Sequence, residues 1–102
     1  MIIYEVNLFV DNEIAEEMAV WLRTHLREML AFDGFVEARW YQLDPADGKQ
    51  RWVCHYYVER MSQLQDYFDQ HAAAMRAEGV KRFGSTFSAN RRILYEREVM
   101  KA

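Results

Sequence analysis

The sequence predicts one α+β domain whose elements follow the order strand, helix, strand, strand, helix, strand. Three observations support this prediction: period-two alternation of apolar residues over residues 2–10, two amphipathic helical stretches, and a turn-forming segment between two aromatic-rich stretches. The length of 102 residues suits a single domain over 1–102, and a hydrophobic content of 51% can supply its core without disulfides or metal.

The first strand and helix are well marked. Ile2 to Val10 alternates, with Ile2, Tyr4, Val6, Leu8 and Val10 on one side, which predicts a strand with one buried face. Asp11 and Asn12 offer N-cap side chains for a helix that we expect from about residue 12 to about residue 31. Apolar and aromatic residues recur there at helical spacing: Ile14, Met18, Trp21, Leu22, His25 and Met29.

A hairpin follows the first helix. Gly34 ends the helix, and Phe35–Leu43 is rich in residues that favour strands. Asp44–Gly48 has turn chemistry, and Arg51–Glu59 reads as the returning strand. So short a connection predicts an antiparallel pair.

The last two elements are a helix and a strand. Ser62 and Gln65 match a Ser-x-x-Gln capping box for a helix that should run to about Phe83, with Gly79 as a possible kink. Gly84 supplies the stop, and Thr86–Glu96 reads as the final strand. The apolar stripe of this helix comprises Leu64, Tyr67, Phe68, His71, Ala72 and Met75.

This order is that of a ferredoxin-like βαββαβ fold, a four-stranded antiparallel sheet with both helices on one face because crossovers are right-handed. The other sheet face is then bare. Its expected apolar side chains are Ile3 and Phe9, with one alternating set from Trp40, Tyr41, Trp52, Val53, Tyr56 and Tyr57. We therefore expect a homodimer formed through the open sheet face.

Composition excludes several classes of function. Thirteen basic and sixteen acidic residues give a net charge of −3, so nucleic acid is not an expected partner, and Arg91 and Arg92 should point to opposite sheet faces. Cys54 is the one cysteine, which rules out an internal disulfide and a Cys-rich zinc site. We expect no leader and no membrane span, and hence a cytoplasmic protein.

Five segments of the chain carry a resemblance to known proteins: Met1–Tyr4 with Val6, Trp21–His25, Asp66–Tyr67, His71–Ala72 with Met75–Arg76, and Arg82–Gly84. In these segments the chain resembles a family of short bacterial proteins classed as a domain of unknown function, similar to the dimeric α/β-barrel superfamily. The resemblance covers nearly the whole chain and implies a ferredoxin-like fold and a homodimer.

That superfamily includes cofactor-free monooxygenases acting on polyphenols, haem-degrading enzymes and domains that only bind small molecules. Its haem-degrading members combine an Asn on the first strand with a Trp and a His on the second helix. Asn7 and His71 stand in matching places here, but no Trp lies between Met61 and Phe83. The chain departs from the haem-degrading pattern, and we expect no cofactor.

His25 and His71 are the candidate catalytic residues, each four positions after an aromatic residue, Trp21 and Tyr67. Helical geometry directs both pairs toward one sheet face, so we expect them to converge on one concavity. Each His is either a hydrogen-bonded core residue or a proton acceptor or ligand contact in a cleft. A metal role is not expected, because no ligand spacing or acidic triad accompanies them.

Trp21, Arg39, Tyr67 and Arg91 are the candidate ligand-binding residues. The arginines either anchor a ligand carboxylate or carbonyl, or form ion pairs across the sheet with Glu5, Glu37 or Glu59. The aromatics either line a pocket for a flat ligand or belong to the core and the dimer interface. Cys54 and His55 are neighbours on a strand, point to opposite faces and are not an expected catalytic pair.

Three functions stay open at this point. The first is a homodimer that binds or senses a small molecule. The second is a cofactor-independent monooxygenase or isomerase acting in a helix–sheet cleft, and the third is a structural dimer that binds other proteins.

Overall fold

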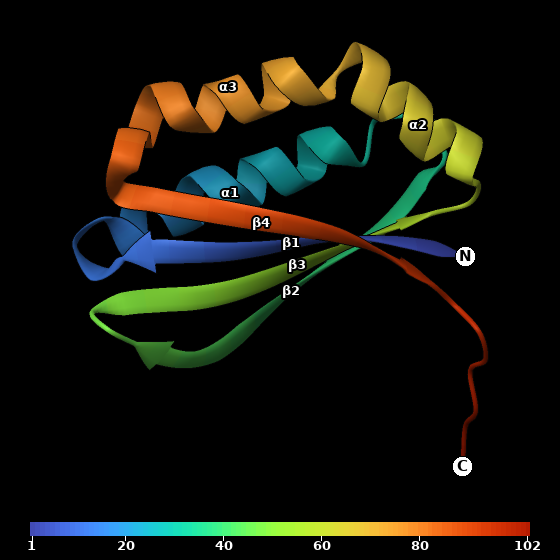
Figure 1. Ribbon diagram of the computed structural model, residues 1–102, viewed down its shortest axis with the longest axis horizontal. Coiled ribbons are helices and arrows are strands. Elements are labelled where there is room, and N and C mark those ends of the chain that lie inside the picture. Colours follow the sequence, from blue (N-terminus) through green and yellow to red (C-terminus); the bar gives the residue numbers. More distant parts are fainter.

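The computed structural model describes all 102 residues and has four strands in one sheet, with the helices on one face (Figure 1). The predicted ferredoxin-like fold class is confirmed. The elements in chain order are β1 (Ile2–Asp11), a 3-10 turn (Asn12–Ile14), α1 (Ala15–Met29), β2 (Phe35–Ala46), β3 (Lys49–Val58), α2 (Met61–Gln70), α3 (Ala72–Phe83), a 3-10 turn (Gly84–Thr86) and β4 (Phe87–Tyr95).

The strands lie in the order β2-β3-β1-β4, and every pair is antiparallel. The register decides which side chains face the helices. Tyr4 pairs with Tyr56 and Leu8 with Trp52, and all four are buried, so the even-numbered residues of β1 and β3 form the covered face. The open face therefore carries the other hairpin set, namely Tyr41, Val53 and Tyr57.

The start of α1 differs from the prediction. Neither Asp11 nor Asn12 caps the helix, which begins at Ala15 after a 3-10 turn and ends at Met29. Asp11 instead accepts a bond from Lys49 Nζ at 2.8 Å, and Asn12 Oδ1 accepts one from the side chain of Gln50 at 3.1 Å. The sequence could not reveal this, because the partners lie 38 positions away on β3.

The hairpin is tighter than expected. β2 continues through Asp44 and Pro45 to Ala46, so the turn consists of Asp47 and Gly48, with φ of 54° and 72°. Positive φ at both central residues fits the Asp-Gly preference of a two-residue hairpin turn. Pro45 is tolerated because β2 is an edge strand, where a missing N–H breaks no interior ladder.

The predicted second helix is two helices, α2 and α3. The N-cap of α2 is Arg60, two residues before the predicted Ser62. The main-chain N–H of Arg60 donates to Gln63 Oε1 at 3.0 Å, so the side chain of Gln63, not that of Gln65, caps the helix. The break lies at His71, where φ is −129° and ψ is −28°, and not at Gly79. Gly79 instead allows close packing of α3, since a Cβ there would lie 3.3 Å from ring atoms of Phe87 and Trp21.

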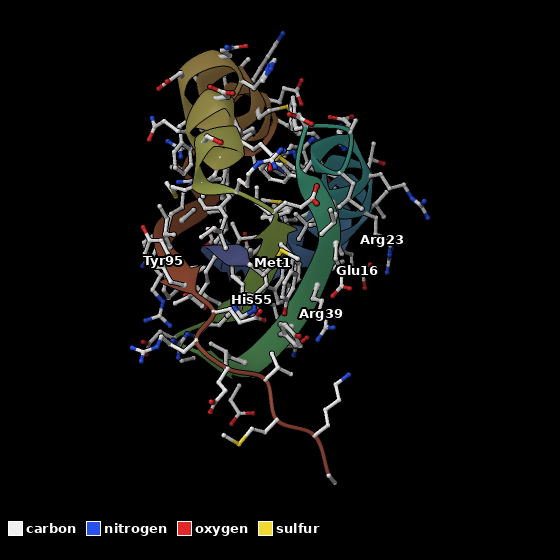
Figure 2. All side chains as sticks on the ribbon, turned by 90° about the vertical axis from the view of Figure 1, so that its right-hand side faces the viewer. Met1, Glu16, Arg23, Arg39, His55 and Tyr95 are labelled. Carbon is white, nitrogen blue, oxygen red and sulfur yellow. The ribbon has the colours of Figure 1, made fainter.

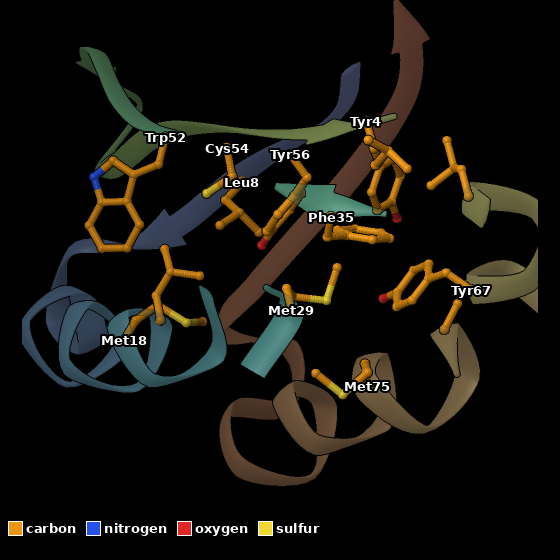
Figure 3. Packing of buried hydrophobic residues seen from close by; sticks show 14 of the residues in the cluster. Tyr4, Leu8, Met18, Met29, Phe35, Trp52, Cys54, Tyr56, Tyr67 and Met75 are labelled. Carbon is orange, nitrogen blue, oxygen red and sulfur yellow. The ribbon is translucent and has the colours of Figure 1, made fainter. Parts of the chain in front are cut away.

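The core lies between the covered sheet face and the helices (Figure 3). Leu64 and Val58 are fully buried, and Cys54 is 1% exposed, so the prediction that Cys54 is a buried apolar residue is confirmed. No helix combines the length and the apolar character that crossing a membrane would need. After β4 the chain runs on in an extended tail beyond the open side of the sheet (Figure 1).

Candidate ligand-binding site

A cavity of about 50 Å³ lies between α1, α3 and the covered face of the sheet. Its walls are mostly apolar, from Trp21, Leu22, Met29, Met75 and Phe87 among others. Its polar groups are His25 on α1, Arg76 on α3, Arg91 on β4 and three tyrosines, Tyr4, Tyr56 and Tyr67. An apolar lining with a few convergent polar groups is typical of a small-molecule site, but about 50 Å³ is below the usual range of about 300–1,000 Å³, so the surrounding side chains must move apart to admit even one aromatic ring.

His25 contributes a buried, unpaired nitrogen to this cavity. Its ring stacks on Trp21 with 4.7 Å between centroids and 15° between planes. Its Nδ1 is buried and has no hydrogen-bond partner. Burial, and secondly the positive charge of Arg91, lower the pKa of His25 from 6.5 to about 4, so the imidazole is neutral at pH 7.

The tyrosines supply hydroxyl groups to the same region. The Tyr4 hydroxyl accepts a bond from Arg76 Nη2 at 3.1 Å. The hydroxyls of Tyr56 and Tyr67 point inward toward Met29 (Figure 3). Burial raises the pKa of Tyr67 to about 12 and that of Tyr56 well above its usual value, so both keep their protons at neutral pH.

The structure brings four of the six predicted site residues together, namely Trp21, His25, Tyr67 and Arg91. The expected convergence of both histidines is wrong. His71 sits at the break between α2 and α3, is exposed, and packs on Phe32 with 4.6 Å between ring centroids. The main-chain N–H of His71 still donates to the Tyr67 carbonyl at 2.9 Å, but the His71 ring lies against Phe32, outside the cavity.

Arg39 is also remote from the cavity. It lies on the open face of the sheet (Figure 2), where Nε contacts Glu37 Oε2 at 2.5 Å and the guanidinium lies 5.2 Å from the Tyr57 ring centroid. The expected pairing across strands is thus wrong for Arg39, whose carboxylate partner is on its own strand. Arg91 has no carboxylate partner at all.

A charged cluster that the sequence analysis missed lies on the open face around Glu5, which is 4% exposed. Glu5 accepts from Asn7 Nδ2 at 3.0 Å, lies 2.8 Å from His55 Nε2, and pairs with Arg92 Nε. Burial by itself would raise its pKa, but the bonds from Arg92, His55 and Asn7 outweigh burial and lower it to about 2. We call these four residues the Glu5 cluster.

The residues matched to haem-degrading enzymes do not form a site. Asn7 faces the open side and bonds to Glu5, whereas His71 lies on the helical side of the sheet. Two groups on opposite sides of a sheet cannot contact one bound haem. This chain therefore departs from the haem-degrading pattern in two ways: it lacks the Trp, and its Asn7 and His71 do not face one site.

Three groups that could ligate a metal also meet beside the cavity. Donor atoms of His25, Glu28 and Glu78 lie within 4.8 Å of one another, because α3 packs beside α1. The sequence analysis expected no acidic triad at either histidine, and it could not foresee Glu78, which is 53 positions away from His25. Both carboxylates are exposed, and exposed acidic groups commonly gather without a metal.

Comparison with known proteins identifies the family. A family model described as "Domain of unknown function (DUF4286)" matches residues 1–97. The chain belongs to this family. The suspected resemblance to a family of unknown function is thereby confirmed. No curated protein sequence matches the chain.

Solved structures agree on the fold. One is a candidate antibiotic biosynthesis monooxygenase of Deinococcus radiodurans, with a TM-score of 0.77 and 11% identity over 100% of this chain and 98% of that chain. A second is a variant of SnoaB, a cofactor-independent oxygenase of Streptomyces nogalater, with a TM-score of 0.67 and 14% identity over 99% of this chain and 98% of that chain. A third is MhuD, a heme-degrader of Mycobacterium tuberculosis with two hemes bound, with a TM-score of 0.65 and 15% identity over 97% of this chain and 99% of that chain. At such identities the likeness shows the fold alone.

Proposed function

We propose that this family member is a homodimer that binds a small molecule in the cavity between α1, α3 and the sheet. The observation that carries the proposal is the buried Nδ1 of His25, which has no partner within the protein. Buried polar atoms in native proteins are nearly always paired, so an unpaired one beside a cavity calls for a ligand or water. The inward hydroxyls of Tyr56 and Tyr67 add donors to the same region.

The dimer is supported by the open sheet face. Val53 and Tyr57 are half-buried there and Tyr41 is 43% exposed, with Ile3 and Phe9 on the neighbouring strand β1. This apolar surface flanks the Glu5 cluster, whose carboxylate already has three partners within one chain. A second copy would cover this apolar surface, and the Glu5 carboxylate would keep its three partners inside the interface.

Binding can be tested with phenol, whose O–H can donate to the neutral nitrogen of His25. We expect phenol to raise the melting temperature of the protein and to bind measurably by isothermal titration calorimetry at pH 7. His25→Phe keeps the aromatic packing on Trp21 but removes the acceptor, and it should weaken phenol binding by about tenfold, the loss of one buried hydrogen bond.

His71→Phe is the matched control, because it makes the same change at the exposed histidine outside the cavity. It should leave phenol binding unchanged. Equal affinities of wild type and His25→Phe, or the absence of any phenol binding, would contradict the proposal.

The second candidate is a cofactor-independent oxygenase, which the structural neighbours favour at the level of the fold. In such a reaction His25 would take a proton from a phenolic or enolic ligand, and the resulting anion would react with dioxygen. A pKa of about 4 makes His25 a weak proton acceptor at neutral pH, so we favour binding over catalysis. Oxygen consumption with a phenolic ligand, lost in His25→Phe, would reverse this preference.

A further inference from the structure

A second hollow, of about 430 Å³, lies where α2 and α3 meet the edge strand β4. We call it the arginine groove, because Arg76, Arg91 and Arg92 all line it. Its volume falls within the range of about 300–1,000 Å³ that is usual for ligand pockets. Tyr4, Arg76 and Arg91 line both this groove and the inner cavity, so the two hollows meet at these side chains.

The arginines of the groove differ in their partners. Arg92 is engaged by Glu5 on the open face of the sheet. Arg76 and Arg91 have no carboxylate within ion-pair distance, and the one protein bond of Arg76 goes to the neutral hydroxyl of Tyr4. Two guanidinium groups thus converge without counter-charge, on a chain whose net charge is −3.

The remaining walls are apolar or aromatic. Phe68 of α2 faces Tyr4 with 5.2 Å between ring centroids, and Ile93 and Tyr95 extend the surface along β4. Tyr95 is 61% exposed, so it offers uncovered aromatic surface next to the arginines. A cationic end beside an apolar wall matches a molecule with an acidic head and an apolar body.

We propose that the arginine groove binds a small organic acid, whose carboxylate lies between Arg76 and Arg91 and whose apolar body lies against Phe68, Ile93 and Tyr95. This inference rests on the proposed binding function and names the chemical class of its ligand. Guanidinium groups bind carboxylates with paired, charge-assisted bonds, which a neutral analogue of the same shape cannot form.

The test uses isothermal titration calorimetry of the full chain at pH 7 with 3-phenylpropionate and with its neutral counterpart 3-phenylpropan-1-ol. We expect the acid to bind at least about tenfold more tightly than the alcohol, and acetate, which lacks the apolar body, to bind more weakly than 3-phenylpropionate. Arg91→Gln and Arg76→Gln should each weaken binding of the acid by about tenfold and leave binding of the alcohol within about twofold.

Arg27→Gln is the matched control, because it removes the same charge from an exposed site on α1 outside both hollows. It should not change the affinity for the acid. Equal binding of acid and alcohol, no binding of either, or the same loss in Arg27→Gln as in Arg91→Gln would overturn the inference. If the acid fails while phenol still binds in a His25-dependent way, the proposed function stands and the inference alone falls.

Discussion

His25 and Glu5 are both ionisable groups held out of water, yet they lie on opposite faces of the sheet and their surroundings differ. Glu5 on the open face has three hydrogen-bond partners, which hold its pKa near 2. His25 on the covered face has a buried nitrogen with none, and its pKa is about 4. A fully paired group stabilises the chain as it stands, whereas an unpaired group beside a cavity is what a binding site needs.

The largest expected effect concerns the open face. Val53→Asp would place a carboxylate at the centre of the proposed dimer interface, where burial without a partner costs several kcal/mol. We expect light scattering to give twice the chain mass of 12.3 kDa for the wild type and a single chain mass for the variant.

Val20→Asp is the control for that experiment. It adds the same charge at a valine that is 65% exposed on α1, and it should stay dimeric. A wild type that is monomeric at micromolar concentration would refute the proposed interface.

Acid should destabilise the protein through His25 first. Its folded pKa of about 4 lies below its unfolded value of 6.5, so the unfolded state binds more protons between these values and stability falls as pH drops from 6.5 to 4. The pKa difference corresponds to a loss of at most about 3–4 kcal/mol. Urea unfolding at fixed protein concentration should show this loss in the wild type, and His25→Phe should lack it.

Glu5 affects the stability of the protein over a lower range of pH. Its folded pKa of about 2 is depressed below 4.5, so the stability it provides is present above pH 4.5 and is lost as pH falls from 4.5 to 2. Glu5→Gln should lower the free energy of unfolding at pH 7 by about 2 kcal/mol, because charge-assisted bonds are lost.

Glu37→Gln provides the comparison for the Glu5 variant. It removes a carboxylate on the same open face of the sheet, but one that is half exposed and pairs with Arg39 on its own strand. The expected change is below about 0.5 kcal/mol. Equal losses in the two variants would mean that the partners of Glu5 add nothing.

The smallest expected effect has the opposite sign. His25→Phe removes a buried unpaired nitrogen while keeping the ring, so it should raise the free energy of unfolding at pH 7 by about 1 kcal/mol. His71→Phe should change it by less than about 0.5 kcal/mol. A destabilised His25→Phe would indicate that Nδ1 is paired with water in the unliganded protein.

Sequence pattern was sufficient for the fold because alternation in β1 and helical spacing in α1 depend on near neighbours. It also found Trp21, His25, Tyr67 and Arg91, each of which stands on the covered side of a regular element. It failed at His71, where the helix breaks with no glycine or proline to signal it. Arg76 and the Glu5 cluster were missed because their roles depend on contacts between residues up to 87 positions apart.

The most direct test of the ligand site is a ¹⁵N NMR titration of the histidine side chains with and without phenol. We predict that His25 stays neutral until the pH approaches 4, and that at pH 7 phenol shifts the nitrogen signals of His25 while leaving those of His55 unchanged. A His25 that titrates near 6.5 and whose signals do not respond to phenol would contradict the account.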